Sequence, residues 1–284
     1  MITQTERTTI EEIARLKARG QPIVMVTVFD YPSARAVERA GADLALAGDS
    51  AGMTVLGHPS TREVSLDEML MLTRAARRGL EHPLLIGDMP FGTYESSDAL
   101  AVRSAKLFAD AGCDAVKIEG AGPIASRVKA IVAAGIPVMG HVGLTPQGVT
   151  NKEEYRARGR NADEAMQIIR DAVELEQSGA FSLVLEAVAS PVADELMRRV
   201  SIPVIGIGAG PATDGQVLVY NDLIGLTDGR PAKFVKQYAL VGEATVEAVS
   251  AFAADVRSRR YPGPEHQYQM SHGELTRFQE RSRA

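Results

Sequence analysis

Residues 115–140 read AVKIEGAGPIASRVKAIVAAGIPVMG, and this stretch contains the pattern that decides the fold. A short apolar run, Ala115–Ile118, is followed by a segment with helical spacing, Gly122–Gly135, and then by a second apolar run, Pro137–Gly140. The helical segment ends in glycine, the residue that most often follows the last turn of a helix. Apolar runs that alternate with helices indicate parallel strands buried on both faces. The stretch therefore predicts a strand–helix–strand unit.

The same pattern recurs along most of the chain. Further apolar runs are Ile23–Phe29, Leu44–Gly48, Leu84–Gly87, Phe181–Leu185, Val204–Ile207 and Leu223–Leu226. The segments of helical spacing between them include Ser33–Gly41, Leu66–Gly79, Ser97–Gly112, Ala162–Gly179 and Ser190–Val200. Eight apolar runs in all favour a closed (β/α)8 barrel, the TIM barrel fold, over an open doubly wound sheet.

Helices are also expected at both ends of the chain. Thr9–Arg19 precedes the first strand and is expected either to plug the bottom of the barrel or to join a subunit interface. Ala244–Ser258 is helical by pattern, and the residues after it are polar with little apolar spacing, which predicts partial disorder. We assign residues 1–258 to one barrel domain and residues 259–284 to a polar tail.

Composition excludes several classes of protein. The formal net charge of −5 argues against a nucleic-acid surface, although a local cleft can still bind an anionic substrate. Cys113 is the only cysteine, so an intramolecular disulfide is impossible and a cysteine-based zinc site is disfavoured. The first residues lack a secretory pattern, and no apolar run approaches the ~20 residues that span a bilayer. A cytoplasmic protein is expected.

Ionisable residues follow the predicted strands, most of them at the end where barrels build their active sites. An isolated charge within an apolar run is costly unless it is paired or bound to a metal. Because six consecutive strands carry such groups, we interpret the cluster as functional. Its members are Asp30, Asp49, Ser50, Asp88, Lys117, Glu119, His141 and Glu186.

Asp49, Asp88 and Glu119 come from three different strands and suit a hard, oxygen-preferring ion. Magnesium fits best, and manganese, nickel or cobalt could replace it. Lys117 would either hold a substrate carboxylate and a developing enolate or form a salt bridge to the acids. His141 is interpreted as a hydrogen-bonding partner behind the ligands, not as a ligand or base.

Three other features carry weaker signals. Residues 206–215, GIGAGPATDG, do not match the dinucleotide-binding fingerprint, and they either contact an anion or simply allow tight backbone passage. Asp222 is expected at the start of the eighth strand. Cys113 falls at the amino end of the fourth strand, the structural end of a barrel, and is not expected to be a nucleophile.

Several stretches that contain these residues resemble the ketopantoate hydroxymethyltransferase family. The likeness runs from about Val24 to His266, and its motifs occur in the family's order with similar spacing. The matching stretches include Gly48-Asp49-Ser50, Asp88-Met89-Pro90-Phe91, Val116-Lys117-Ile118-Glu119-Gly120, Gly140-His141-Val142-Gly143-Leu144-Thr145-Pro146-Gln147, Val184-Leu185-Glu186 and Ile202–Gly210.

The resemblance implies a barrel of the phosphoenolpyruvate/pyruvate superfamily, assembled as a decamer from two pentamers. It implies transfer of a hydroxymethyl group from methylenetetrahydrofolate to α-ketoisovalerate, giving ketopantoate for pantothenate biosynthesis. It further implies that Asp49, Asp88 and Glu119 form the magnesium site. The keto acid would be contacted by Asp49, Ser50, Asp88 and Lys117. Glu186 would accept the proton. The residues alone support metal-assisted enolisation of a 2-oxo acid.

The chain departs from the family in one loop and at its end. Glu153-Glu154 stands where the family has a glycine pair, and Ala157-Arg158 replaces a Val-Gln pair. Because this loop is expected near the mouth of the active site, the one-carbon donor and the keto acid stay open, as does the role of the tail beyond His266. The alternatives are a metal-dependent carbon–carbon lyase or aldolase, a paralogue acting on another 2-oxo acid, and a binding protein without catalysis.

Overall fold

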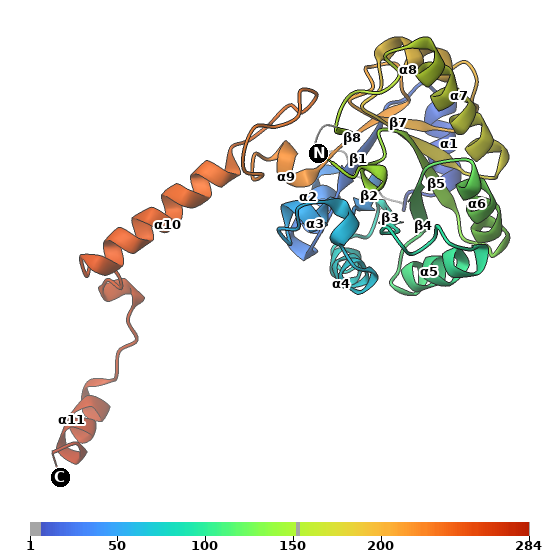
Figure 1. Ribbon diagram of the computed structural model, residues 1–284. Helices are drawn as coiled ribbons and strands as arrows, with labels where there is room; N and C mark the ends of the chain where they lie inside the picture. Colours follow the sequence, from blue (N-terminus) through green and yellow to red (C-terminus); the bar gives the residue numbers. More distant parts are fainter. Residues whose placement is uncertain (1–6, 152–153, 284) are drawn as a thin grey trace. The chain divides into compact units, whose positions relative to one another are not determined.

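Eight parallel strands close into a barrel in their order along the chain (Figure 1). The structure is a computed structural model that describes residues 7–151 and 154–283. Closure is made by β8 and β1, which pair from Ile23 with Gly215 to Val26 with Leu218. The predicted (β/α)8 barrel is therefore confirmed. Its strands are β1 Ile23–Thr27, β2 Leu44–Ala47, β3 Leu84–Asp88, β4 Ala115–Glu119, β5 Val138–Gly143, β6 Ser182–Glu186, β7 Val204–Ile207 and β8 Gly215–Leu218.

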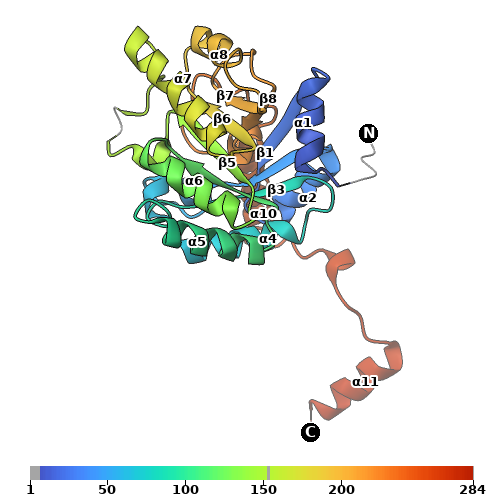
Figure 2. The same cartoon turned by 90° about the vertical axis from the view of Figure 1, so that its right-hand side faces the viewer.

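Helices on the outside of the barrel bury one face against the strands (Figure 2). Side chains at their first turns accept backbone N–H groups, as Asp30 does for α2, Ser65 for α4, Ser97 for α5 and Asn161 for α7. The longer helices are α2 Tyr31–Ala40, α4 Leu66–Arg77, α5 Asp98–Asp110, α6 Pro123–Ala133, α7 Ala162–Gln177 and α8 Ser190–Leu196. Short turns lie at α3 Ala51–Thr54, η1 Thr61–Glu63, η2 Pro146–Gly148 and α9 Tyr220–Leu223.

The predicted eighth strand, Leu223–Leu226, is wrong. The strand that closes the barrel is Gly215–Leu218, and Leu223 is the last residue of α9. Gly215 lies so close to β1 that a Cβ atom there would overlap the Ile23 carbonyl oxygen, and Gln216 is exposed. A strand made of glycine, glutamine and two apolar residues has no apolar run, so its pattern does not reveal it. Asp222 consequently lies on α9 and not at the start of a strand.

Alternation along each strand separates two apolar layers. On β4, Val116 and Ile118 face the surrounding helices, whereas Ala115 joins the cluster inside the barrel. The period of two therefore turns Lys117 and Glu119 inward as well. The inner cluster fills only the lower part of the barrel, and the charged side chains continue it toward the carboxyl ends of the strands. Because both faces are buried, the strands read as continuous apolar runs in the sequence.

The first helix, α1 Ile10–Ala18, closes the amino-terminal end of the barrel. Its Ile13 is fully buried and packs in the inner cluster, with Ile10 and Leu16 partly buried around it. Thr9 caps the helix by accepting the N–H of Glu12. Of the two roles expected for this helix, the contacts within the chain match the plug.

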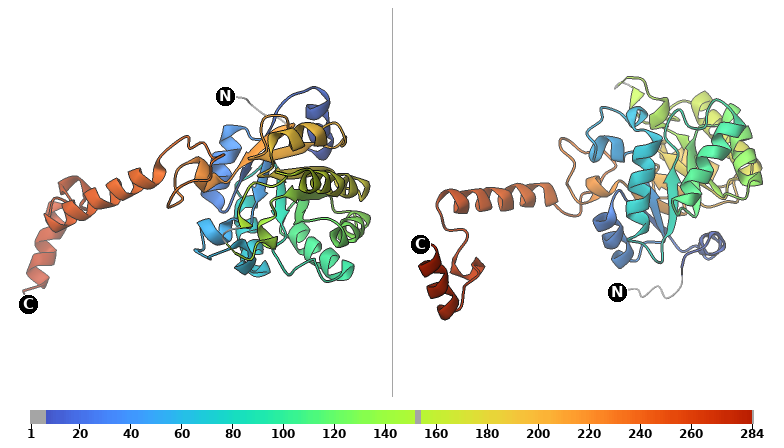
Figure 3. Two further views of the ribbon diagram at one scale, coloured as in Figure 1. Left: turned by 45° about the horizontal axis from the view of Figure 1, so that its top comes forward. Right: turned by 90° about the horizontal axis from the view of Figure 1, so that it is seen from below.

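The chain divides into two compact units, Met1–Tyr238 and Ala239–Ala284. The second unit contains α10 Val241–Arg257, the turn η4 Pro264–His266 and α11 His272–Arg281 (Figure 3). The Tyr261 ring packs edge-on against Phe252 and at a tilt against His266, with 5.3 and 5.0 Å between ring centroids, which ties α10 to the residues after it. The division thus falls before α10, whereas the sequence pattern places it at residue 258. No helix within the described part of the chain is long and apolar enough to cross a membrane.

Candidate active site

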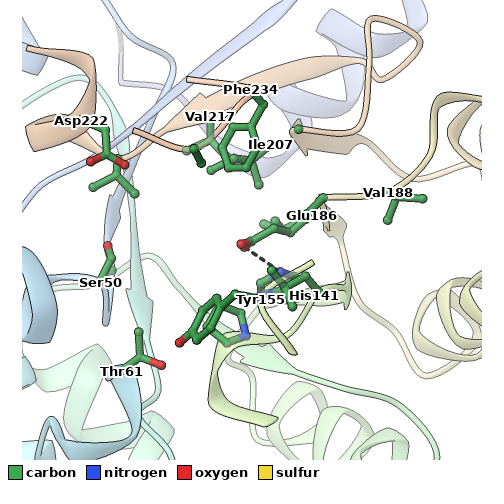
Figure 4. A pocket seen from close by; sticks show the side chains of 18 of the residues that line it. Ser50, Thr61, His141, Tyr155, Glu186, Val188, Ile207, Val217, Asp222 and Phe234 are labelled. Carbon is green, nitrogen blue, oxygen red and sulfur yellow. Dashed lines mark ion pairs between the residues drawn. The ribbon is translucent and has the colours of Figure 1, made fainter. Parts of the chain in front are cut away.

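A cavity of about 930 Å³ opens at the carboxyl ends of the barrel strands. Figure 4 shows side chains from several strands and loops directed into it, among them Glu186, His141, Ser50 and Tyr155. The sequence-predicted residues that line this cavity are Asp49, Ser50, Asp88, Lys117, Glu119, His141 and Glu186. Asp30 does not line it, because its carboxylate caps α2.

Lys117 lies at the centre of the polar floor. Its Nζ atom is 2.8 Å from Asp88 Oδ1 and 3.4 Å from Glu119 Oε1, and all three side chains are almost completely buried. Burial alone would lower the pKa of Lys117, but Asp88, Glu119 and Asp49 outweigh it and raise that pKa. Lys117 is therefore a permanent cation that offsets part of the negative charge around it. The salt bridge expected from the sequence is present.

His141 connects the two ends of the polar floor. Its Nδ1 atom lies 3.2 Å from Glu119 Oε1, and its Nε2 atom lies 3.3 Å from Glu186 Oε2. Burial and nearby Lys117 act to lower the pKa of His141, but Glu119 and Glu186 outweigh them and raise it to about 9. The raised pKa makes His141 a positively charged partner of the two carboxylates at neutral pH.

Glu119 is the most strongly ionised acid of the site, and Asp49 is the least. Burial would raise the pKa of Glu119, but Lys117 and His141 overcome this and lower it to about 2. Burial, followed by the charges of Asp88 and Glu119, raises the pKa of Asp49 well above its ordinary value. The repulsion between these carboxylates exceeds what Lys117 offsets.

Glu186 has more access to the cavity than the rest of the group. Its side chain is 17% exposed, compared with 2–4% for Asp88, Lys117, Glu119 and His141. The backbone around it is unusual, because Ala187 has a left-handed φ of 48°, a conformation that costs an L-residue about 1–2 kcal/mol. The turn redirects the chain directly after the carboxylate.

Sequence reasoning missed two buried residues of the floor, Gln147 and Tyr94. Gln147 donates its backbone N–H to Glu119 Oε2 at 3.0 Å and its side-chain Nε2–H to Asp49 Oδ2 at 2.9 Å. The Tyr94 hydroxyl donates to Gln147 Oε1 at 2.7 Å. Both residues lie in loops after strands, where no periodicity identifies them. The only signal was that Gln147 ends the motif that begins at Gly140.

The three predicted metal ligands meet at the floor without forming a closed set of ligands. Asp49 donates its backbone N–H to Asp88 Oδ2 at 3.0 Å, and Asp88 and Glu119 both approach Lys117. Over residues 7–151 and 154–283, no group of three or more His, Cys, Asp or Glu side chains surrounds a common point as a metal site would. The donor chemistry and the excess of negative charge nevertheless suit a divalent cation.

The upper walls of the cavity are apolar and aromatic, with a few charges. Tyr155, Arg156 and Ala157, which belong to the loop that departs from the family, line the cavity. Phe234 lines it opposite Tyr155 (Figure 4). A Cβ at Gly208, whose φ is +67°, would lie 2.6 Å from the Phe234 ring, so this position of the glycine-rich segment seats an aromatic side chain.

Glu154 and Arg158, also in the departing loop, do not line the cavity. Glu153 lies outside the described residues, and Glu154 accepts the backbone N–H of Thr150 at 2.8 Å. Arg158 uses its backbone N–H to pair with the Ala187 carbonyl at 2.7 Å, directly after Glu186. Ala157-Arg158 therefore lies at the mouth of the site, as the sequence predicts.

Cys113 lies away from the cavity, before β4 at the amino-terminal end. Its sulfur packs where a side chain on Gly87 would lie, and burial raises the pKa of its thiol. Both observations match the expectation that it is not a nucleophile.

The sequence is similar to a family profile and to relatives that share one enzyme name. A family profile described as ketopantoate hydroxymethyltransferase matches residues 7–264. The 3-methyl-2-oxobutanoate hydroxymethyltransferase of Nitratidesulfovibrio vulgaris (strain DP4) is 47% identical over 95% of this chain and 88% of its own length. The protein of that name from Aeropyrum pernix is 48% identical, with 92% and 94% covered. A mitochondrial enzyme of Arabidopsis thaliana, 3-methyl-2-oxobutanoate hydroxymethyltransferase 1, is 46% identical, with 96% and 81% covered. The resemblance inferred from the motifs is confirmed.

Solved structures with the same fold are much more distant in sequence. A phosphonopyruvate hydrolase in complex with oxalate and Mg²⁺ superposes with a TM-score of 0.59 at 14% identity, covering 96% of each chain. A 2,3-dimethylmalate lyase, a member of the PEP mutase/isocitrate lyase superfamily, gives a TM-score of 0.58 at 15% identity, covering 95% of this chain and 94% of its own. These likenesses establish the barrel type.

Proposed function

The chain belongs to the ketopantoate hydroxymethyltransferase family, and on that basis we propose that it transfers a hydroxymethyl group from methylenetetrahydrofolate to 3-methyl-2-oxobutanoate (α-ketoisovalerate), giving ketopantoate. The observation that carries the proposal is a continuous chain of polar contacts inside one cavity. It runs from Asp88 through Lys117, Glu119 and His141 to Glu186, with no step longer than 3.4 Å.

In this proposal Glu186 removes the C3 proton of the keto acid. It is the most accessible carboxylate of the chain of contacts, and it faces the space where the substrate would lie. His141, charged at neutral pH, stabilises the ionised form of Glu186 and so keeps it ready to accept a proton. We therefore assign His141 as the charged partner of the base.

Lys117 holds the opposite end of the substrate. A permanent ammonium between Asp88 and Glu119 can bind the keto-acid carboxylate and stabilise negative charge on the keto oxygen as C3 loses its proton. The C3 carbon then forms a bond to the methylene carbon of the donor, and the two bonds from that carbon to the folate nitrogens break. Water supplies the hydroxyl group, and tetrahydrofolate leaves after its two nitrogens take up the C3 proton and the remaining proton of water.

Asp49, Asp88 and Glu119 would hold magnesium or a related divalent ion. Their hard oxygen donors support this assignment, and so does Asp49, whose pKa is raised first by burial and then by the charges of Asp88 and Glu119. When bound, such an ion polarises the keto oxygen as a Lewis acid. Ser50, at the rim beside Asp49, is proposed to contact the keto acid.

The size and walls of the cavity support a second substrate. A volume of about 930 Å³ is far larger than a five-carbon keto acid requires. Tyr155 and Phe234 offer aromatic surface, and Arg156 and Lys233 offer positive charge, for a flat and partly anionic donor. We therefore propose that the donor enters along this upper wall. The decamer of two pentamers implied by the resemblance is also proposed, and sedimentation equilibrium would test it.

Proton exchange in deuterium oxide tests the proposal. We expect the C3 proton signal of α-ketoisovalerate to disappear at a rate that depends on Mg²⁺, even without folate, and Glu186→Gln to nearly abolish the exchange. Glu195→Gln is the matched control, because Glu195 is an acid on the outer helix α8 that pairs with Arg198 and Arg199. Exchange that survives Glu186→Gln would remove Glu186 as the base.

Product analysis separates the remaining alternatives. Ketopantoate should form when methylenetetrahydrofolate is added, and other one-carbon donors and 2-oxo acids should be compared in the same assay. Cleavage of isocitrate-like or oxaloacetate-like substrates without folate would instead identify a carbon–carbon lyase.

A further inference from the structure

Gln147 makes a complete set of hydrogen bonds at the buried floor of the cavity. Its backbone N–H donates to Glu119 Oε2 and its Nε2 group to Asp49 Oδ2, at 3.0 and 2.9 Å. The same Nε2 group donates to the Met89 carbonyl at 3.0 Å. A carbonyl can only accept, so the amide orientation is determined by its surroundings. Gln147 is 2% exposed, which makes each of these bonds costly to lose.

Each of the three acids has one oxygen held by a protein donor. Asp88 Oδ2 accepts from the Asp49 backbone, and Gln147 supplies the donors to both Asp49 Oδ2 and Glu119 Oε2. The other oxygens of Asp88 and Glu119 face Lys117 Nζ at 2.8 and 3.4 Å. Holding one oxygen of a carboxylate fixes the direction of the other.

From this geometry we infer that Gln147 is a positioning residue for the divalent cation: by holding one oxygen of Asp49 and one of Glu119 it sets the direction of each carboxylate toward the ion. The inference rests on the proposed function and adds a residue that touches neither the substrate nor the cation. Outer partners of this kind orient metal ligands, and their loss weakens metal binding.

Two neighbours hold Gln147 itself. The Tyr94 hydroxyl donates to Gln147 Oε1 at 2.7 Å and accepts the Glu119 backbone N–H at 3.2 Å. Arg62 donates to the Gln147 carbonyl oxygen and stacks over the ring of Phe91, with 3.7 Å from its guanidinium carbon to the ring centroid. Two other loops thereby hold Gln147, Tyr94 at the side-chain amide and Arg62 at the backbone carbonyl.

The variant Gln147→Met tests the inference by calorimetric titration of Mg²⁺. Methionine keeps the length of the side chain and the backbone N–H to Glu119. It removes the two Nε2 hydrogen bonds and the Oε1 acceptor of the Tyr94 hydroxyl. We expect Mg²⁺ to bind about 10- to 100-fold more weakly. Gln216→Met is the matched control, because the Gln216 amide also makes two hydrogen bonds, to Gly210 O at 3.0 Å and Thr213 Oγ1 at 2.9 Å, away from the acids. The control should bind Mg²⁺ with wild-type affinity.

Deuterium exchange at C3 gives a second readout, which a purely structural role would not move. Because Gln147 does not touch the keto acid, raising the Mg²⁺ concentration should restore most of the exchange rate of Gln147→Met. A rate that stays low at saturating Mg²⁺ would overturn the inference, as would wild-type Mg²⁺ affinity in the folded variant.

Tyr94→Phe provides the test if Gln147→Met does not fold. It keeps the ring and removes the hydroxyl that orients the amide, so Mg²⁺ affinity should fall several-fold, and wild-type affinity would overturn the inference. A wild-type protein that binds no Mg²⁺ would instead overturn the metal-assisted part of the proposed function, and this inference with it.

Discussion

The imidazole of His141 spans the gap between Glu119 and Glu186, with Nδ1 3.2 Å from one carboxylate and Nε2 3.3 Å from the other. Glu119 belongs to the proposed cation site and Glu186 is the proposed base, so one cationic ring connects the two functions. The Nε2 contact is close but lacks the alignment of a good hydrogen bond. Catalytic hydrogen bonds are often loose before substrate binds.

Replacing His141 should therefore impair both functions. In His141→Asn, Glu186 loses its cationic partner and Glu119 keeps only Lys117. We expect C3 exchange to slow by about 10- to 100-fold, together with weaker Mg²⁺ binding. The control is His82→Asn, since His82 also pairs with an acid, Glu38, but before β3 at the other end of the barrel. The prediction fails if both variants exchange at the wild-type rate.

Much of the site could be predicted because β4 carries charged residues within a buried apolar strand. Lys117 and Glu119 interrupt an apolar run, and a buried charge needs a partner, so the conflict itself indicates function. The same reasoning applies to Asp88 and Glu186, which end their strands. Counting the apolar runs favoured a closed barrel, although one of the eight, Leu223–Leu226, is not a strand.

The remaining features depend on contacts between distant residues. Gln147 acts on Asp49, 98 positions earlier in the chain, and nothing local in either loop specifies that contact. The strand β8 was missed because its hydrogen bonds to β1 compensate for a sequence that contains Gly215 and Gln216. The residues after 258 group with α10 in one compact unit, where Tyr261 packs back onto Phe252 of that helix.

Glu38 gives a pH dependence that does not involve the active site. Burial acts to raise its pKa, but hydrogen bonds from the His82 side chain and from the N–H groups of Glu81 and His82 outweigh burial and lower it. A lowered pKa in the folded state stabilises the protein above the ordinary value of 4.5, and this contribution is lost as the pH falls below it.

We therefore expect Glu38→Gln to unfold about 2–4 °C below the wild type at pH 7, corresponding to about 1 kcal/mol. The difference should shrink as the pH falls below 4.5. Thermal melts from pH 3 to pH 7 would measure it, with the exposed Glu81→Gln as the control. A difference that grows toward acid would contradict the assigned sign.

Cys113 separates the proposed transferase from a lyase that uses a cysteine. Burial raises the pKa of its thiol, so little thiolate forms at neutral pH and iodoacetamide should label the folded protein slowly. Cys113→Ala should keep C3 exchange and ketopantoate formation within about twofold, at a cost of about 1 kcal/mol in stability. Loss of turnover in a folded Cys113→Ala would favour the lyase.

Gly143 determines how closely β5 approaches Glu186. The two residues are register partners on adjacent strands, and a Cβ at Gly143 would overlap the Glu186 carbonyl oxygen. Gly143 also has a φ of +96°, which costs an L-residue about 1–2 kcal/mol. Gly143→Ala should thus lower the melting temperature and displace the end of β6, including the proposed base.

Gly135→Ala isolates the backbone cost of a positive φ from the overlap with Glu186. Gly135 has a φ of +83°, and no atom lies within 4 Å of the place that a Cβ would take, so its alanine variant bears the backbone cost without the overlap. Both variants should lose stability, but only Gly143→Ala should slow C3 exchange, by about 100-fold, because a displacement of about 1 Å at a reacting group has that effect. Equal exchange rates in the two variants would mean that Glu186 tolerates the shift, and the assignment of Glu186 as the base would lose its geometric support.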